Sequence, residues 1–128
     1  HGIDPTADSL HLGNLVGIVA LAWFQKFGHQ VYALIGGATG KIGDPSGKSV
    51  ERPLLSEEML AHNVEALTSF CRKILAFPGG QAPIILNNFS WLGAFSLIDF
   101  LRDVGKHFRM GPMLAKESVR TRIQSDEG

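Results

Sequence analysis

The chain has 128 residues, 45% of them hydrophobic, which suits one domain with a buried core. Twelve basic side chains balance twelve acidic ones, so overall charge makes no case for a nucleic-acid-binding or membrane-surface protein. The most apolar stretch, residues 15–24, is shorter than the roughly 20 residues needed to cross a bilayer, and no basic-then-apolar leader precedes it, which predicts a soluble chain without a membrane partner.

The first predicted element is a helix over residues 10–26. Asp8 or Ser9 can cap its start, and Gly28 marks its end. Apolar side chains recur along this helix at helical spacing, which predicts a buried stripe. The members of the stripe are Leu12, Leu15, Val19, Ala22 and Trp23.

A Pro-Thr turn and a histidine lie at the start of this helix. The first turn of a helix carries unpaired N–H groups and a positive dipole end, so an anion can bind there and His11 can add a donor. His11 and Asn14 project from one face of that turn, beside the Thr6 hydroxyl, and Gly2 and Gly13 would allow close approach of a ribose or base. The segment predicts a phosphate site. The alternatives are a capping or solvated histidine and ordinary turn chemistry for the threonine and glycines.

The next segment combines a strand with a long loop. Residues 31–35 form a short apolar run that predicts a buried parallel strand, and a strand-helix-strand unit here requires another strand before residue 1. Residues 36–55 predict a loop that is rich in glycine at first and charged later. Loops of that length are typical of functional or mobile segments, so this one is a candidate active-site segment.

Strands and helices continue to alternate in the second half. Ser56 caps a helix that stops at Phe77 and Pro78 and contains the lone cysteine, Cys71, at an apolar position that predicts burial. No repeat or internal domain boundary is evident. The alternation predicts an α/β fold with helices flanking a parallel sheet. Its remaining elements are a strand over residues 82–86 and helices over residues 95–104 and 113–123.

The glycine-rich residues 36–49 suggest two kinds of nucleotide-binding loop, and the spacing excludes both. A Walker A loop needs a glycine five positions before Gly47, where this chain has Ile42, and a dinucleotide-binding G-x-G-x-x-G run is absent. Asp44 is the one carboxylate in this segment. It can pair with a substrate ammonium group, and an Asp-Pro turn is the alternative.

Other charged and metal-binding residue types give weaker signals. Lys48 and Arg52 lie further along the loop, where they can swing onto phosphate or remain solvated. The five histidines are scattered and Cys71 has no second cysteine, so no metal site is predicted. The last quarter of the chain contains basic side chains that could contact RNA, although a solvated surface balanced by nearby acidic residues is the favoured interpretation. The basic residues are Lys106, His107, Arg109, Lys116, Arg120 and Arg122.

Two motifs together make the chain resemble the tyrosyl-tRNA synthetases of bacterial or organellar type, class I aminoacyl-tRNA synthetases with a Rossmann-like catalytic domain. Residues 5–14 resemble the family's HIGH signature. Residues 33–48 resemble its block Ala-Leu-x-Gly-Gly-Ala-Thr-Gly-x-Ile-Gly-Asp-Pro-Ser-Gly-Lys, and residues 100–108 and 115–119 resemble later segments. Tryptophanyl enzymes can share the first motif but do not resemble the second, so the implied amino acid is tyrosine.

The resemblance implies a role for each matched residue at the start of the first helix. Thr6 and His11 would bind the phosphates of ATP and stabilise the transition state as the carboxylate of L-tyrosine attacks the α-phosphorus. Asp4 and Gly13 would lie at the nucleotide. Asn14 would stand near the ribose, in place of the second histidine of the signature.

The resemblance also implies roles for the loop. Asp44 would hold the ammonium group of tyrosine. Lys48 and Arg52 would close on the departing pyrophosphate, and Mg²⁺ would accompany ATP.

The resemblance further implies that residues 1–128 are an N-terminal part of a catalytic domain, truncated at both ends. The strand before Gly2 would be nearly absent, and the tyrosine-ring pocket, the second lysine-rich loop and the anticodon-reading regions would lie beyond Gly128. The isolated segment is therefore expected to be weak or inactive. The parent enzyme would be a homodimer that charges tRNA(Tyr) in a bacterial cytoplasm, a mitochondrion or a plastid. The alternative is a non-catalytic nucleotide-binding or RNA-associated module with the same fold.

Overall fold

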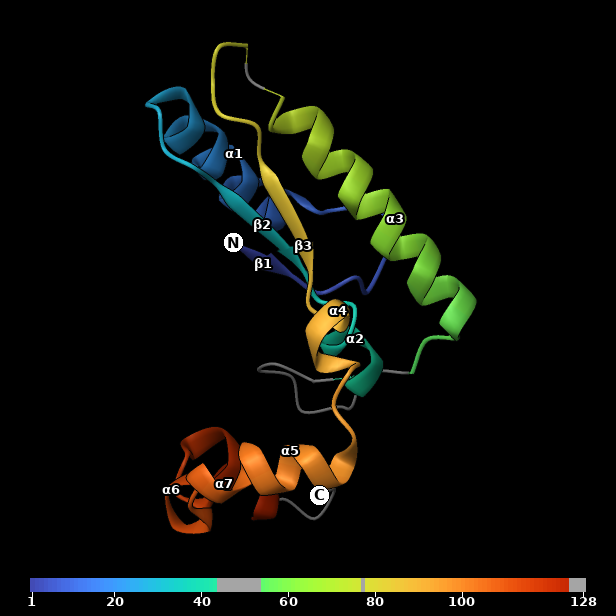
Figure 1. The fold of residues 1–128 in the computed structure, drawn as a ribbon, viewed down its shortest axis with the longest axis vertical. Helices are drawn as coiled ribbons and strands as arrows, with labels where there is room; N and C mark the ends of the chain where they lie inside the picture. The colour runs from blue at the N-terminus through green and yellow to red at the C-terminus, as the bar shows by residue number, and fades with distance from the viewer. Residues whose placement is uncertain (44–53, 77, 125–128) are drawn as a thin grey trace.

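The structure is a computed structural model that describes residues 1–43, 54–76 and 78–124 (Figure 1). None of the helices within these ranges is long and apolar enough to span a membrane. The elements are, in order, β1 (Gly2–Ile3), α1 (Leu12–Lys26), β2 (Tyr32–Ile35), α2 (Thr39–Ile42), α3 (Glu57–Ile74), β3 (Ile84–Asn87), α4 (Phe89–Leu92), α5 (Leu97–Asp103), the 3-10 helix η1 (Gly105–His107), α6 (Met110–Leu114) and α7 (Glu117–Ile123).

The three strands form one parallel sheet in the order β1-β2-β3. Gly2 pairs with Leu34, and Ile35 pairs with Asn87. The first strand, β1, lies at Gly2–Ile3 and completes a β1-α1-β2 unit, so the strand-helix-strand order does not need the strand before residue 1 that the sequence-based prediction required. The predicted α/β fold with a parallel sheet is confirmed.

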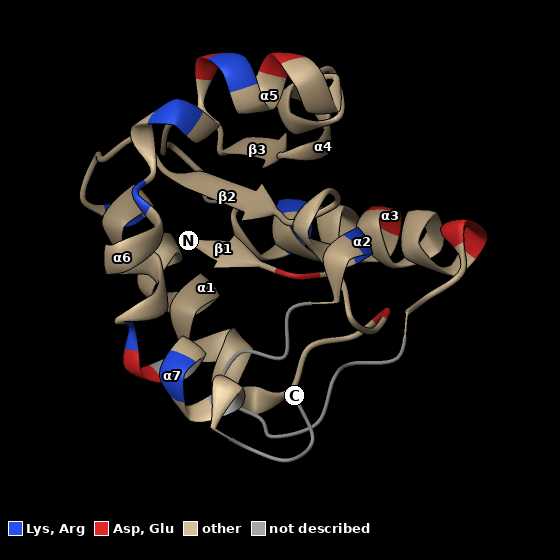
Figure 2. Cartoon of the chain, turned by 90° about the horizontal axis from the view of Figure 1, so that it is seen from below, with Lys and Arg blue, Asp and Glu red and all other residues tan. Residues whose placement is uncertain are grey.

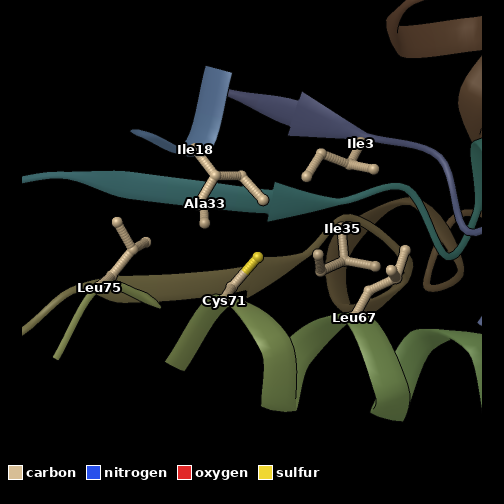
Figure 3. Close-up of a cluster of buried hydrophobic side chains, with 7 residues drawn as sticks. All are labelled: Ile3, Ile18, Ala33, Ile35, Leu67, Cys71 and Leu75. Carbon is tan, nitrogen blue, oxygen red and sulfur yellow. The ribbon is translucent and has the colours of Figure 1, made fainter. Parts of the chain in front are cut away.

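Helices α1 and α3 cover the same face of this sheet and contact each other. Ala33 and Ile35 of β2 point into the core between them, because alternate residues of a strand face the same side. Figure 3 shows the seven buried side chains of this core, which are Ile3, Ile18, Ala33, Ile35, Leu67, Cys71 and Leu75. The opposite face carries the exposed side chains of Tyr32, Ile84 and Leu86.

The start of α1 differs from the sequence-based prediction. The helix begins at Leu12, and its N-cap is His11, neither Asp8 nor Ser9. The backbone of His11 is extended, and its ring nitrogen Nδ1 accepts a hydrogen bond of 3.0 Å from the Gly13 N–H. A histidine thus takes the capping position that small polar residues usually occupy.

The buried face of α1 was predicted only in part: Ala22 packs against the core and Leu15 is half-buried, but the other three members of the predicted stripe are exposed. Ile18 and Gln25 are the buried residues of the helix, whereas Leu12 is 80% exposed and Trp23 is 53% exposed. Apolar side chains occur on both sides of α1, so spacing could not select the face that meets the sheet. The Nε2 of the buried Gln25 donates to the carbonyl of Gln81 on the segment before β3, whereas its Oε1 has no hydrogen-bond partner among the described residues.

Two short helices occupy segments for which no helix was predicted. α2 lies in the glycine-rich loop, where a Cβ on Gly40 would come within 3.1 Å of Leu60 and 3.2 Å of Pro5. Glycine therefore allows α2 to pack closely against α3 and the turn after β1. α4 follows β3 directly, and the Asn87 side chain accepts from the Phe89 N–H at its start. A tertiary contact thus accounts for α2, whereas a local side-chain hydrogen bond marks the start of α4.

The last predicted helix is divided in two, as α6 and α7. α6 begins at Met110, earlier than expected, because Pro112 lies in its first turn, where a missing N–H costs no helical hydrogen bond. α5 agrees with the prediction apart from its ends and is capped by Ser96. Helices α5, α6 and α7 lie beyond one end of the sheet in Figure 1, where α5 contacts η1 and α6 contacts α7.

Smaller corrections concern the ends of two other elements. α3 begins after the Ser56 cap as predicted, and it ends at Ile74, before the predicted Phe77. β3 begins and ends later than the predicted 82–86.

Helix α5 carries both basic and acidic residues (Figure 2). Arg102 forms ion pairs with Asp99 and Asp103. The hydrogen bond from Arg102 lowers the pKa of Asp103.

Cys71 is expected to be chemically inert in the folded protein. Its side chain is fully buried in the core, and burial raises the pKa of its thiol, so little reactive thiolate is present at neutral pH. A thiol reagent should label it only after unfolding, and Cys71→Ser should lower the free energy of unfolding by about 1–3 kcal/mol by burying an unpartnered hydroxyl. Labelling kinetics with and without denaturant check the first expectation. Rapid labelling of the native protein would contradict it.

An ion pair joins α2 to α3 at the surface. Lys41 Nζ lies 2.7 Å from Glu57 Oε1, and the hydrogen bond and charge of Lys41 lower the pKa of Glu57. A carboxylate whose pKa is lower in the folded state stabilises the fold above its unfolded pKa, and this effect disappears as the pH falls through the folded pKa. Glu57→Gln should thus be slightly less stable than the parent at neutral pH and equal to it in acid. Thermal unfolding across pH tests this, with Glu58→Gln as the control in the same helical turn.

Candidate functional site

A polar cavity of about 250 Å³ lies between the carboxyl end of β1 and the start of α1. Four of the residues predicted for the nucleotide site line it: Asp4, Thr6, His11 and Asn14. The other lining residues are Gly2, Ile3, Ala7, Ser9 and Leu10. The structure therefore brings together side chains from the strand end, the Pro-Thr turn and the first helical turn.

Two hydrogen bonds hold the Pro-Thr turn, one within the turn and one from α3. The Thr6 N–H donates to the Asp4 carbonyl at 2.9 Å, which closes the turn. Pro5 is buried, and its carbonyl accepts a 3.1 Å hydrogen bond from Nδ2 of the buried Asn63 on α3. Asn63 was not singled out from the sequence, because only the tertiary packing places it beneath this turn.

The cap at α1 determines which nitrogen of His11 can donate. Nδ1 accepts from the Gly13 N–H, so it must carry a lone pair, and the ring hydrogen must lie on Nε2. The Gly13 N–H is consequently satisfied by the protein. The donor that His11 can offer to an anion is therefore its Nε2–H, and the Gly13 N–H is not one of the unpaired N–H groups of the first turn.

Gly13 does not line the cavity, and it has a packing role beside His11. A Cβ at this position would lie 2.9 Å from His11 Cε1 and 3.1 Å from Nδ1, too close for the capping ring to stay in place. Glycine at this position therefore permits the ring orientation that aims Nε2–H outward from the cap.

Three side chains link the carboxyl ends of the three strands, and we call them the strand-end clasp: Asp4, Thr39 and Asn88. Thr39 Oγ1 donates to Asp4 Oδ1 at 2.8 Å and accepts from Asn88 Nδ2 at 3.2 Å. Asn88 Oδ1 accepts from the Ala38 N–H at 2.7 Å, and the Asn88 residue is buried. Neither Thr39 nor Asn88 was predicted as a site residue, because the clasp joins positions far apart in the sequence.

The glycine pair after β2 makes room for polar side chains at these strand ends. A Cβ on Gly36 would lie 2.1 Å from Asp4 Oδ1 and 2.5 Å from Thr39 Oγ1, and a Cβ on Gly37 would lie 2.3 Å from Asn87 Oδ1. Both glycines are buried. The sequence predicted that these two glycines lie in a loop. The structure shows that a side chain at either position would collide with the polar groups at the strand ends.

The other predicted site residues belong to the segment after α2. Asp44, Lys48 and Arg52 lie outside the described residues, so their predicted roles stay predictions. Within the described ranges, no group of three or more His, Cys, Asp or Glu side chains is arranged to hold a metal ion. Asp4 is the only acidic side chain among the described residues that line the cavity.

Known proteins match the whole chain. The family model for class I tRNA synthetases (W and Y) matches residues 1–128. A tyrosine–tRNA ligase of Protochlamydia amoebophila is 59% identical over 99% of this chain, and the chloroplastic/mitochondrial tyrosine–tRNA ligase of Arabidopsis thaliana is 52% identical over 99%. The chain spans 30% and 25% of the lengths of these two relatives.

A solved structure agrees in fold. The C-terminally truncated mitochondrial tyrosyl-tRNA synthetase of Aspergillus nidulans superimposes with a TM-score of 0.81 and 30% identity, over 99% of this chain and 39% of that one. The parallel sheet described above therefore has the Rossmann-like fold of that structure. Because the family model matches from the first residue to the last, this chain belongs to the class I tRNA synthetase family of the tryptophan and tyrosine enzymes.

Proposed function

We propose that the protein containing this chain is a tyrosine–tRNA ligase, which activates L-tyrosine with ATP and transfers it to tRNA(Tyr). The observation that carries the proposal is the cavity at the start of α1, where Thr6, His11 and Asn14 meet. The names of the similar proteins support tyrosine as the amino acid. We further propose that residues 1–128 are an N-terminal part of the catalytic domain.

The proposed first step is the formation of tyrosyl-adenylate. A carboxylate oxygen of tyrosine attacks the α-phosphorus of ATP, the new P–O bond forms, and the bond to pyrophosphate breaks. Negative charge grows on the phosphoryl oxygens during this step. Donors fixed in advance at that position stabilise the transition state more than the ground state, and we assign this role to the Thr6 hydroxyl and to Nε2–H of His11.

The other predicted residues would hold the substrates. Asp4 and Asn14 line the cavity and would contact the nucleotide, with Gly13 shaping the same helix start. Asp44 would pair with the tyrosine ammonium group. Lys48 and Arg52 would close on pyrophosphate as it leaves, and Mg²⁺ would enter with ATP as part of that substrate.

The test is ATP–pyrophosphate exchange by the full-length protein, assayed with tyrosine, with tryptophan and without an amino acid. Exchange that requires tyrosine supports the proposal. Exchange only with tryptophan, or ATP binding without any exchange, would contradict it, and the second result would favour a nucleotide-binding module. Residues 1–128 alone should show weak exchange or none, because we expect the tyrosine-ring pocket to lie outside them.

We also propose that the protein forms a homodimer. Large apolar side chains are exposed on α5 and α6, including Leu97 (71%), Ile98 (69%) and Met110 (65%), and a second copy could cover them. Sedimentation equilibrium should give twice the chain mass, and Ile98→Glu should shift the protein toward monomer.

We propose that the reaction supplies tyrosyl-tRNA for protein synthesis. The compartment would be a bacterial cytoplasm, a mitochondrion or a plastid.

A further inference from the structure

We propose that Thr39 is a positioning residue that holds the carboxylate of Asp4 in place for the nucleotide. The inference rests on the proposed function, because it assigns Thr39 to the ATP side of that site. Thr39 itself does not line the cavity, whereas Asp4 does. The contact between them crosses from the loop after β2 to the end of β1.

The Thr39 hydroxyl donates its hydrogen bond to the Asp4 carboxylate. A hydroxyl has a single hydrogen, and the 2.8 Å contact with Asp4 Oδ1 is shorter than the 3.3 Å contact with the Gly36 carbonyl, so the hydrogen bond to the carboxylate dominates. The lone pairs on Oγ1 remain free to accept from Asn88 Nδ2. Asn88 is in turn held by the Ala38 N–H, so the hydroxyl is oriented before any substrate arrives.

The same geometry explains why the position of Asp4 matters for ATP. The clasp engages Oδ1, and among the described residues Oδ2 has no protein hydrogen-bond partner. A carboxylate oxygen only accepts hydrogen bonds when it is ionised, and it repels phosphate. On a nucleotide, the groups that can donate to it are the ribose hydroxyls and the 6-amino group of adenine. A carboxylate free to rotate would have to be ordered at each binding event, and the clasp removes this entropic cost.

The test uses the full-length protein and two substitutions of similar size. Thr39→Val keeps the shape and removes the hydroxyl, and Thr39→Ser keeps the hydroxyl. We expect Thr39→Val to raise the KM for ATP about tenfold, in line with the loss of one hydrogen bond to a charged group, and leave the KM for tyrosine unchanged. Thr39→Ser should restore the KM for ATP to within about twofold, since the hydrogen bond to Asp4 is kept.

A matched control separates positioning from folding. Thr68 on α3 also donates its hydroxyl to an acceptor of the protein, the Val64 carbonyl at 2.7 Å, and Thr68→Val should leave both KM values unchanged. An unchanged KM for ATP in Thr39→Val would overturn the proposal. A rise of both KM values together with a lower Tm, or a failure of serine to restore the KM for ATP, would also overturn it, since a structural role would then suffice.

Failure of the proposed function gives a different result. If the parent protein shows no tyrosine-dependent exchange, the proposed reaction is wrong. Equilibrium dialysis with ATP then tests Thr39 independently, and about tenfold weaker binding by Thr39→Val, restored by Thr39→Ser, would still support the positioning role. Equal ATP binding by all three proteins would overturn it.

Discussion

Replacing His11 with alanine is expected to lower kcat for tyrosine-dependent exchange by about a hundredfold to a thousandfold, the usual cost of removing one donor from a developing oxyanion. The structure supports this expectation because the hydrogen bond from the Gly13 N–H leaves the ring hydrogen on Nε2 and because His11 lines the cavity. Exchange kinetics with saturating ATP and tyrosine measure kcat directly. A reduction of less than about fivefold would rule out this role for His11.

The same substitution also removes the cap of α1, and a second variant separates the two effects. Loss of a capping side chain costs about 1 kcal/mol of stability, so His11→Ala should have a lower Tm. Serine caps helices well but is too short to place a donor where Nε2 lies. His11→Ser should therefore recover most of the stability and remain as inactive as His11→Ala. Recovery of activity together with stability would show that the cap alone accounts for the loss.

Gly36→Ala is expected to reduce kcat/KM for ATP by about a hundredfold, because shifts of about 1 Å at a reacting site can cost that much. The added Cβ would lie 2.1 Å from Asp4 Oδ1 and 2.5 Å from Thr39 Oγ1, so both side chains must leave the strand-end clasp. Overpacking of this kind should also lower the free energy of unfolding by about 1–3 kcal/mol. Steady-state kinetics with varied ATP and denaturant unfolding measure the two effects.

Gly111→Ala is the matched control for that experiment. Gly111 lies in α6, and apart from its two chain neighbours a Cβ there would meet nothing within 4 Å. The substitution should leave exchange unchanged and lower the stability only slightly, since a Cβ directly before Pro112 crowds the proline ring in helical backbone. If Gly36→Ala behaved like Gly111→Ala, the close approach at the strand ends would have no functional role.

The sequence predicted much of the fold because its strongest signals are local. Ser56 caps α3 through the Met59 N–H, as its place before two glutamates indicated. The apolar run before the glycine pair is β2, and the HIGH-like segment does form the start of α1 beside a cavity. Capping, hydrophobic runs and turns depend on a few neighbouring residues, so they could be recognised without coordinates.

The buried face of α1 could be predicted only in part from the sequence, and the strand-end clasp not at all, because both result from contacts between residues far apart in the chain. α1 is apolar on both sides, and only packing against the sheet and α3 selects Ile18 and Gln25 as its buried residues. The helix α2 is short and contains glycine, so its stability comes from α3 and the Pro-Thr turn.

The sequence by itself determined the alternation of strands and helices, the family resemblance and the group of polar residues at the start of α1. The tertiary structure decided that His11 is the cap, that Gly36 must lack a side chain, and that Thr39 meets Asp4 across 35 positions of sequence. The physical reason is the parallel sheet, which brings the carboxyl ends of successive strands to one edge, so residues far apart in the chain become hydrogen-bonded neighbours.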